Sequence, residues 1–177
     1  EFPLPDLTKE METVTTLLQT NGVKGSYVLL VPGTRGDHKK WPIEYWGELA
    51  RKLAEDKITT VIAGSKGEMP MGEAIRKLSP SPYTVNLMGR TNLLELAALE
   101  KMAVLHISSD TGPLHIANAV HTPIIALFGP TLPDRSGPYG NDNSHVLLAE
   151  HPGTKGCKMS SIPVEKVYRM IRDILRK

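Results

Sequence analysis

Cysteine is almost absent from this chain of 177 residues, because Cys157 stands alone. A single cysteine excludes an internal disulfide and a structural zinc site built on several thiolates, and it fits a reducing, cytoplasmic setting. An excess of one charge is also lacking, since 21 Lys and Arg residues face 19 Asp and Glu residues. That balance argues against nucleic acid as a partner bound through bulk electrostatics.

Long apolar runs are missing as well, and no stretch approaches the roughly 20 residues that span a bilayer. Residues 1–6 lack the basic start and the apolar stretch of a signal peptide, so we expect no leader there. Hydrophobic residues nevertheless make up 40% of the chain, and charged residues 23%. This composition provides one buried core and excludes a disordered chain, a collagen-like fibre and a coiled-coil rod.

Short apolar runs alternate with helical patterns along the whole chain. We expect strands over residues 27–31, 58–63, 83–87, 104–108, 124–128 and 145–149. We expect helices over residues 7–19, 43–55, 73–78, 92–102, 113–120 and 163–176, and a long loop over 129–143. Such alternation predicts an α/β fold: a Rossmann-like parallel sheet with helices on both faces.

Ligands of such sheets bind in the loops beyond the carboxyl ends of the strands. The first unusual loop spans residues 108–115, between a strand and a helix. Amides at the helix start, close approach at Gly112 and the Thr111 hydroxyl would suit a phosphate, with His115 one turn further on. The alternative is that Asp110 only caps the helix and that His115 is a core histidine.

Two further loops follow strands. Residues 32–42 carry several cations, and a lysine there could neutralise a phosphate; the alternative is a solvated basic loop with Trp41 packed on the sheet. Residues 128–138 form a long, proline-rich loop, which suits either a pocket wall or a surface excursion.

Several familiar signatures are absent. The chain has no G-x-x-x-x-G-K-[ST] phosphate loop, no G-x-G-x-x-G after the first strand and no G-x-S-x-G elbow. The histidines lack metal-ligand spacing, and no Asp-x-Asp pair marks a divalent-cation site. Cys157 between Lys155 and Lys158 has no placed base, so we interpret it as incidental.

Five motifs in order do point to a family. Pro-Gly with K-x-W-P, G-x-x-x-E, N-L-x-G-[KR]-T-x-L, S-x-D-T-G-P-x-H-x-A-x-A and P-x-x-A-L-F-G-P-T-x-P occur at residues 32–42, 64–68, 86–93, 108–119 and 123–133. In these motifs the chain, from about residue 28 to 175, resembles the carboxy-terminal half of a family 9 glycosyltransferase, the ADP-heptose:lipopolysaccharide heptosyltransferases.

The resemblance implies one half of a GT-B architecture, in which two Rossmann-like domains face each other across a cleft. It implies an interdomain linker and lead-in helix over residues 1–26 and a nucleotide-sugar-binding domain over 27–177. The carboxy-terminal half would bind the donor, whereas the general base would lie in the amino-terminal half. No catalytic residue is therefore expected here, and the isolated chain is expected to transfer nothing.

Site residues carry over by motif position. The resemblance implies that Lys39 contacts the donor diphosphate, that Glu68 hydrogen-bonds the ribose and that Thr91 lines the base pocket. It further implies that phosphates and sugar are held by Asp110, Thr111, Gly112 and His115. The spacing before Lys39 varies in the family, so Thr34 and Arg35 receive no role. Relatives often have several cysteines where this chain keeps only Cys157.

The resemblance also implies the partners: ADP-heptose or a similar nucleotide-sugar, a lipopolysaccharide precursor as acceptor, and the amino-terminal domain. Neither a metal nor a cofactor is expected. We expect a cytoplasmic location, where any association with the inner face of the inner membrane would run through the amino-terminal half. The alternatives are a nucleotide-sugar epimerase or hydrolase half of GT-B type and a non-catalytic nucleotide-binding module.

Overall fold

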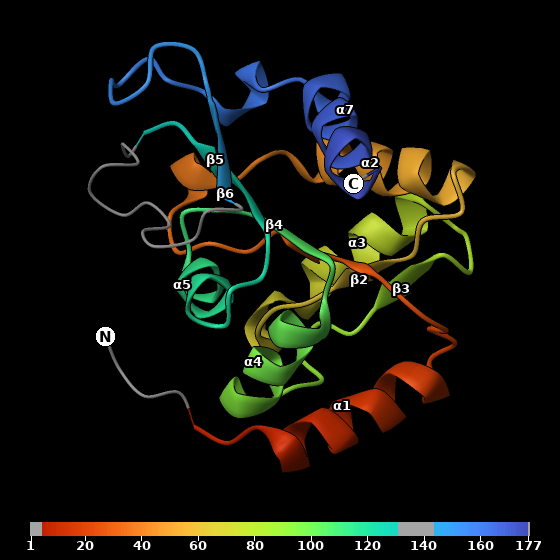
Figure 1. Ribbon diagram of the computed structural model, residues 1–177. Helices are drawn as coiled ribbons and strands as arrows, with labels where there is room; N and C mark the ends of the chain where they lie inside the picture. The colour runs from red at the N-terminus through yellow and green to blue at the C-terminus, as the bar shows by residue number, and fades with distance from the viewer. Residues whose placement is uncertain (1–4, 131–143, 177) are drawn as a thin grey trace.

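Short strands rich in Val, Ile and Leu form one parallel sheet in the computed structural model, which describes residues 5–130 and 144–176. The strands are β1 (Val28–Val31), β2 (Thr60–Ile62), β3 (Thr84–Asn86), β4 (Leu105–Ser109), β5 (Ile124–Phe128) and β6 (Ser144–Leu148). Their order across the sheet is β3-β2-β1-β4-β5-β6, and every neighbouring pair is parallel (Figure 1).

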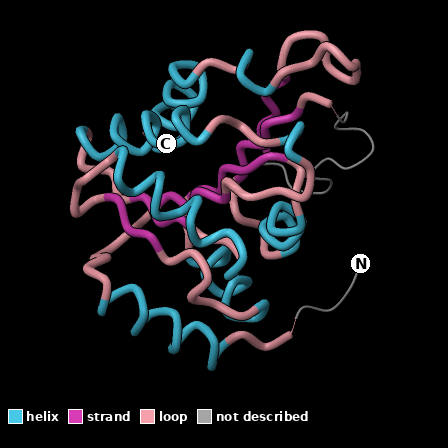
Figure 2. Tube along the Cα trace, turned by 180° about the vertical axis from the view of Figure 1, so that it is seen from behind, coloured by secondary structure: helices cyan, strands magenta, loops and turns pink. Residues whose placement is uncertain are grey.

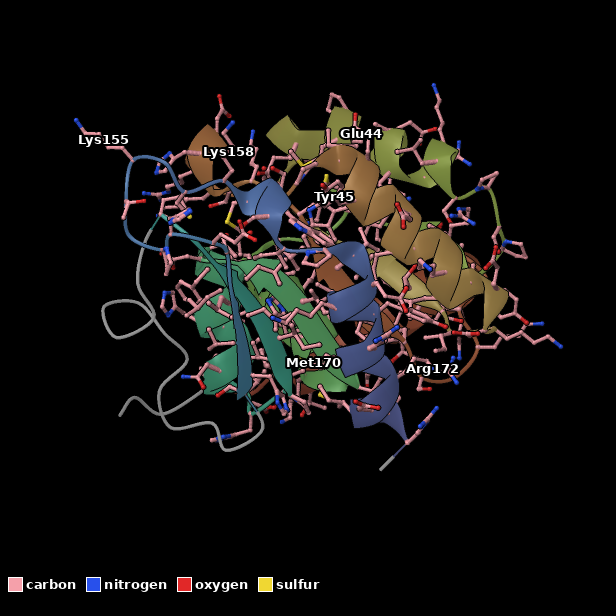
Figure 3. All side chains as sticks on the ribbon, turned by 90° about the horizontal axis from the view of Figure 1, so that it is seen from above. Glu44, Tyr45, Lys155, Lys158, Met170 and Arg172 are labelled. Atoms are coloured by element: carbon pink, nitrogen blue, oxygen red, sulfur yellow. The ribbon has the colours of Figure 1, made fainter. Side chains whose placement is uncertain are left out.

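Helices cover both faces of this sheet. They are α1 (Thr8–Thr20), α2 (Ile43–Glu55), α3 (Met69–Leu78), α4 (Leu93–Met102), α5 (Gly112–Ala119) and α7 (Val164–Leu175), with short 3-10 turns at Asp37–Lys39, Lys66–Glu68 and Met159–Ser161. Helices α2, α3 and α7 lie on one face, and α1, α4 and α5 lie on the other (Figures 1 and 2). In the view from above, α7 runs alongside α2 over the strands (Figure 3).

Burial explains the continuous apolar strands. All residues of β1 and β5 are buried, as expected for central strands covered on both faces. On one face, β1 and β4 pack with Trp46 of α2 and Ile171 of α7 into one hydrophobic cluster. On the other face, Val14 of α1 and Leu99 of α4 belong to a second cluster. The sheet is thus the centre of a three-layer core.

The predicted α/β fold is confirmed, and the predicted bounds of α2 and β5 are those observed. Helix α3 was expected to begin at residue 73 but begins at Met69, because Pro70 fits its first turn and the preceding 3-10 turn runs into it. Most of the expected long loop (131–143) and the start of the expected linker (1–4) lie outside the described residues. Helix α1 packs against α4, while the division at residue 26 stays a prediction.

The strand order places a topological switch point between β1 and β4. The chain leaves β1 toward α2 on one face, and it leaves β4 toward α5 on the other (Figure 1). A crevice is expected between two such diverging connections, at the carboxyl ends of the strands. Within the described residues, no helix combines the length and apolar character needed to cross a bilayer.

Candidate functional site

A pocket of about 600 Å³ lies at the carboxyl edge of the sheet. Its walls come from the connections that follow β1, β2, β3 and β4, and we call it the carboxyl-edge pocket. The site residues predicted from the sequence all line it: Lys39, Glu68, Thr91, Asp110, Thr111, Gly112 and His115. The fold therefore brings together residues that are far apart in the sequence: Thr34 and Asp110, which share a hydrogen bond, are 76 positions apart.

The amino terminus of α5 forms one wall. Thr111 is the N-cap residue in an extended conformation, and Gly112 and Pro113 form the first turn. A Cβ added at Gly112 would meet no atom within 4 Å, so open space lies in front of its backbone. Amides at a helix amino terminus and the positive end of the helix dipole favour an anion in such a space.

Lys39 ends a 3-10 turn and reaches across to the loop after β4. Its Nζ atom lies 3.4 Å from Asp110 Oδ2, and both side chains are largely shielded from solvent. Thr34 donates its hydroxyl to the Asp110 carbonyl oxygen at 2.9 Å. These two contacts tie the loop after β1 to the loop after β4, so a cation stands beside the α5 amino terminus.

Trp41 follows Lys39 closely and has a structural role. Its ring is 1% exposed, and its Nε1 donates to the Ile162 carbonyl at 3.0 Å. The loop over residues 32–42 thus has features of both interpretations of the sequence, because Lys39 lines the pocket and Trp41 packs on the sheet.

Glu68 stands on the opposite side of the β1 loop. Its Oε1 accepts from the Ser65 amide at 3.2 Å and from the Ser65 hydroxyl at 3.1 Å. The first of these bonds is one half of the capping box that Ser65 and Glu68 form around the 3-10 turn. A Cβ at Gly33 would lie 2.0 Å from Glu68 Oε2. The carboxylate is therefore oriented by Ser65 and seated in the space that Gly33 leaves empty.

The loop between β3 and α4 supplies an apolar wall. Asn92 caps α4, because its side-chain oxygen accepts from the Glu95 amide and its own amide donates to the Glu95 carboxylate. Thr91 is free to face the pocket beside Leu93, whose side chain is 70% exposed, and Leu96. A flat apolar group such as a base would contact these two leucines.

The alternative of a core histidine is wrong for His115, which is exposed and lines the pocket. The sequence analysis did not predict four further pocket residues: Ser65, Asn92, Leu93 and Leu96. The S-x-x-E spacing from Ser65 to Glu68 and the N-x-x-E spacing from Asn92 to Glu95 were the signals for two of them.

Cys157 is buried, and burial raises the pKa of its thiol, which disfavours the reactive thiolate. Of the loop over 128–138, residues 131–138 lie outside the described part of the chain. Within the described ranges, no group of three or more His, Cys, Asp or Glu side chains is placed to hold a metal ion.

Comparison with known families decides the membership. The model of glycosyltransferase family 9 (heptosyltransferase) matches residues 3–164. The chain belongs to glycosyltransferase family 9.

Curated relatives agree. The chain is 34% identical over 146 residues to lipooligosaccharide heptosyltransferase 2 of Haemophilus influenzae, a match that covers 80% of this chain and 41% of that protein. It is 28% identical over 151 residues to lipopolysaccharide heptosyltransferase 1 of Pseudomonas aeruginosa, covering 82% and 41%. The chain therefore spans about two fifths of the length of these family 9 relatives.

Solved structures of family 9 enzymes share the fold. The E. coli ADP-heptose lipopolysaccharide heptosyltransferase II superposes with a TM-score of 0.81 at 23% identity, over 98% of this chain and 53% of that one. The E. coli heptosyltransferase WaaC with ADP gives a TM-score of 0.73 at 28% identity, over 93% and 48%. The predicted fold, half of a GT-B heptosyltransferase, is thereby confirmed.

Proposed function

We propose that this chain is the donor-binding half of an inverting glycosyltransferase that moves heptose from ADP-heptose to the inner core of lipopolysaccharide. One observation carries the proposal: loops from four strands converge on a pocket in which the Lys39 ammonium stands beside the amino terminus of α5. Both features favour a diphosphate. ADP and ADP-2-deoxy-2-fluoro heptose occupy solved structures of the related WaaC.

Each wall has its part in holding the donor. Lys39 and the amides of Thr111 and Gly112 bind the diphosphate at the α5 end. Asp110 and His115 face the sugar, because they flank this anion site on the β4 loop and on the first turn of α5.

The nucleoside lies on the other side of the pocket. Glu68 accepts from a ribose hydroxyl through its carboxylate, whose orientation Ser65 fixes. Thr91 and the adjoining leucines, Leu93 and Leu96, form the wall for the base.

Transfer requires the amino-terminal half as well. The acceptor hydroxyl gives its proton to a base of that half, and its oxygen forms a bond to the anomeric carbon. The bond from that carbon to the diphosphate oxygen breaks, and ADP leaves with the electron pair. Lys39 and the α5 amides stabilise the charge that develops on the leaving oxygen, because they are in place before the reaction.

Calorimetry with ADP-heptose, ADP and UDP tests the donor site directly. We expect ADP and ADP-heptose to bind the chain, and no heptose to be transferred until an amino-terminal half of a family 9 enzyme is supplied. Absence of binding by every nucleotide contradicts the donor site. Turnover by the isolated chain contradicts the division of labour.

The same preparation separates the alternatives. Release of free sugar from ADP-heptose without acceptor would indicate a hydrolase half, and a changed sugar stereochemistry would indicate an epimerase half. Nucleotide binding with no transfer after the amino-terminal half is supplied would indicate a non-catalytic module.

A further inference from the structure

Three fully buried polar side chains lie beneath the loop that follows β4. His106 Nδ1 lies 2.8 Å from Oε1 and 2.9 Å from Oε2 of Glu100, and His106 Nε2 lies 2.7 Å from Ser108 Oγ. Ser108 donates its hydroxyl to the Ser109 carbonyl at 2.9 Å. These hydrogen bonds form a row that begins at Glu100 near the end of α4 and passes through His106 and Ser108 of β4. It ends at the carbonyl of Ser109, the residue before Asp110.

The order serine, histidine and carboxylate is that of a nucleophile with its base, yet burial excludes this role. Glu100, His106 and Ser108 are each 0% exposed, and none of them lines the carboxyl-edge pocket. A nucleophile must reach its substrate, and these three side chains reach none. Their hydrogen bonds can therefore only position other parts of the protein.

The number of protons that each group carries indicates which group donates and which accepts in each of these hydrogen bonds. A carbonyl oxygen can only accept, so the contact between Ser108 Oγ and the Ser109 carbonyl is a hydrogen bond when the single Ser108 proton is directed at that carbonyl. In this arrangement Ser108 Oγ accepts from Nε2–H of His106. Nδ1 and the Glu100 carboxyl group then share one proton. Wherever that proton sits, the pair has no net charge, as full burial requires.

The far end of the row is anchored by other contacts. The Thr122 hydroxyl donates to the Glu100 carbonyl at 2.6 Å, and the Tyr27 hydroxyl donates to the adjacent Leu99 carbonyl at 2.6 Å. The last turn of α4 is therefore fixed to Tyr27, the residue before β1, and to the loop before β5. A row with one fixed end can hold its other end, the Ser109 carbonyl, in place.

We propose that Glu100, His106 and Ser108 are positioning residues for the donor site: their hydrogen bonds fix the Ser109 carbonyl and so orient the peptides of Asp110, Thr111 and Gly112. The effect on ligand binding rests on the proposed function. The ordering of the loop is a property of the unliganded chain and is tested separately.

Ser108→Ala removes the hydrogen bonds of the Ser108 hydroxyl and changes the side-chain volume only slightly. Its matched control is Ser79→Ala, because Ser79 is 1% exposed and shares a 2.8 Å hydrogen bond with Thr84 at the amino end of β3, away from the pocket. We expect Ser108→Ala to lower the ¹⁵N order parameters of Asp110 to Gly112 from about 0.85 toward 0.6. Ser79→Ala should leave them unchanged. Equal values in both variants would overturn the positioning role.

ADP affinity gives a second readout. Ser108→Ala should weaken binding by about threefold to tenfold, the value of one hydrogen bond, whereas Ser79→Ala should not. Glu100→Gln should restore what Glu100→Leu loses, because an amide N–H can donate to Nδ1 and keep Nε2–H directed at Ser108. If the unaltered chain fails to bind ADP, the proposed function fails, while the order parameters still decide the positioning role.

The protonation of the His106 ring nitrogens tests the assignment of donors and acceptors directly. In ¹⁵N-detected spectra of the chain at neutral pH, we expect a proton on His106 Nε2, as that assignment requires. An unprotonated Nε2 would reverse the Ser108 hydroxyl, release the Ser109 carbonyl and overturn the inference.

Discussion

The carboxylate of Glu68 occupies the volume that a side chain at Gly33 would need. A Cβ built at Gly33 lies 2.0 Å from Oε2 and 2.3 Å from Cδ of Glu68. Two loops that follow different strands therefore fit together only because the earlier one carries a glycine. The orientation of the acidic side chain toward the pocket depends on that fit.

Gly33→Ala should consequently weaken ADP binding by about tenfold, the loss of one hydrogen bond to a charged group, because Glu68 must move away. Calorimetry measures the change. Gly67→Ala is the control, since a Cβ there meets only Ser65 Oγ, at 4.0 Å. An unchanged affinity in Gly33→Ala would show that Glu68 does not contact the nucleotide.

Lys39→Ala should weaken ADP binding by about tenfold to a hundredfold, because it removes a charged donor from a partly shielded site. Its neighbour provides a matched control. Lys40 pairs with the exposed Asp37 at 3.0 Å and does not line the pocket, so Lys40→Ala should bind ADP as the unaltered chain does. Similar losses in both variants would indicate general charge attraction rather than a diphosphate contact.

Gly112→Ala separates binding from stability. A Cβ there meets no protein atom within 4 Å, so thermal unfolding should shift by no more than about 2 °C. The methyl group would nevertheless stand in front of the α5 amides, and ADP affinity should fall. A normal affinity would place the phosphates elsewhere.

Acid should weaken the packing of α7 on α2. Hydrogen bonds from Tyr168 and Arg172 hold the pKa of Asp56 below its ordinary value near 3.8, and Arg172 lies at the side of α7 that faces α2 (Figure 3). A lowered pKa means that the stabilisation is fully present above pH 3.8 and is lost as the pH falls through the lower, folded value.

Asp56→Asn should therefore lower the free energy of unfolding at pH 7, and the difference from the unaltered chain should shrink below pH 3.8. Denaturant unfolding across this range measures it. Glu55→Gln, which removes an exposed ion pair with Arg51, is the control and should cost less. A difference that stays constant with pH would exclude ionised Asp56 as the cause.

The sequence predicts elements best where one local signal dominates. The bounds of α2 follow from Pro42 and a 3.6-residue apolar period, and those of β5 from five consecutive apolar residues between breakers. Helix α3 was predicted too short because its first turn, which contains Pro70, has no apolar period of its own.

Motif positions predicted seven of the residues that line the pocket, but not their contacts. Lys39 and Asp110 are 71 positions apart, and only the strand order brings them together. The partnership of His106 and Glu100 left one trace in the sequence, a histidine inside a strand whose other residues are apolar or small. Which buried group forms a hydrogen bond with this histidine depends on how α4 packs, and no local sequence pattern contains that information.

The contact between Lys39 and Asp110 also bears on how an anion finds the pocket. Because the lysine is already opposed by a carboxylate 3.4 Å away, the two charges largely cancel at a distance. Long-range steering is therefore weak, and the arriving group must compete for the ammonium at close range. Small monovalent ions compete poorly in such an exchange, whereas a multiply charged diphosphate competes well. For the proposed diphosphate ligand, selectivity would thus arise at contact, and we expect association to depend only slightly on ionic strength.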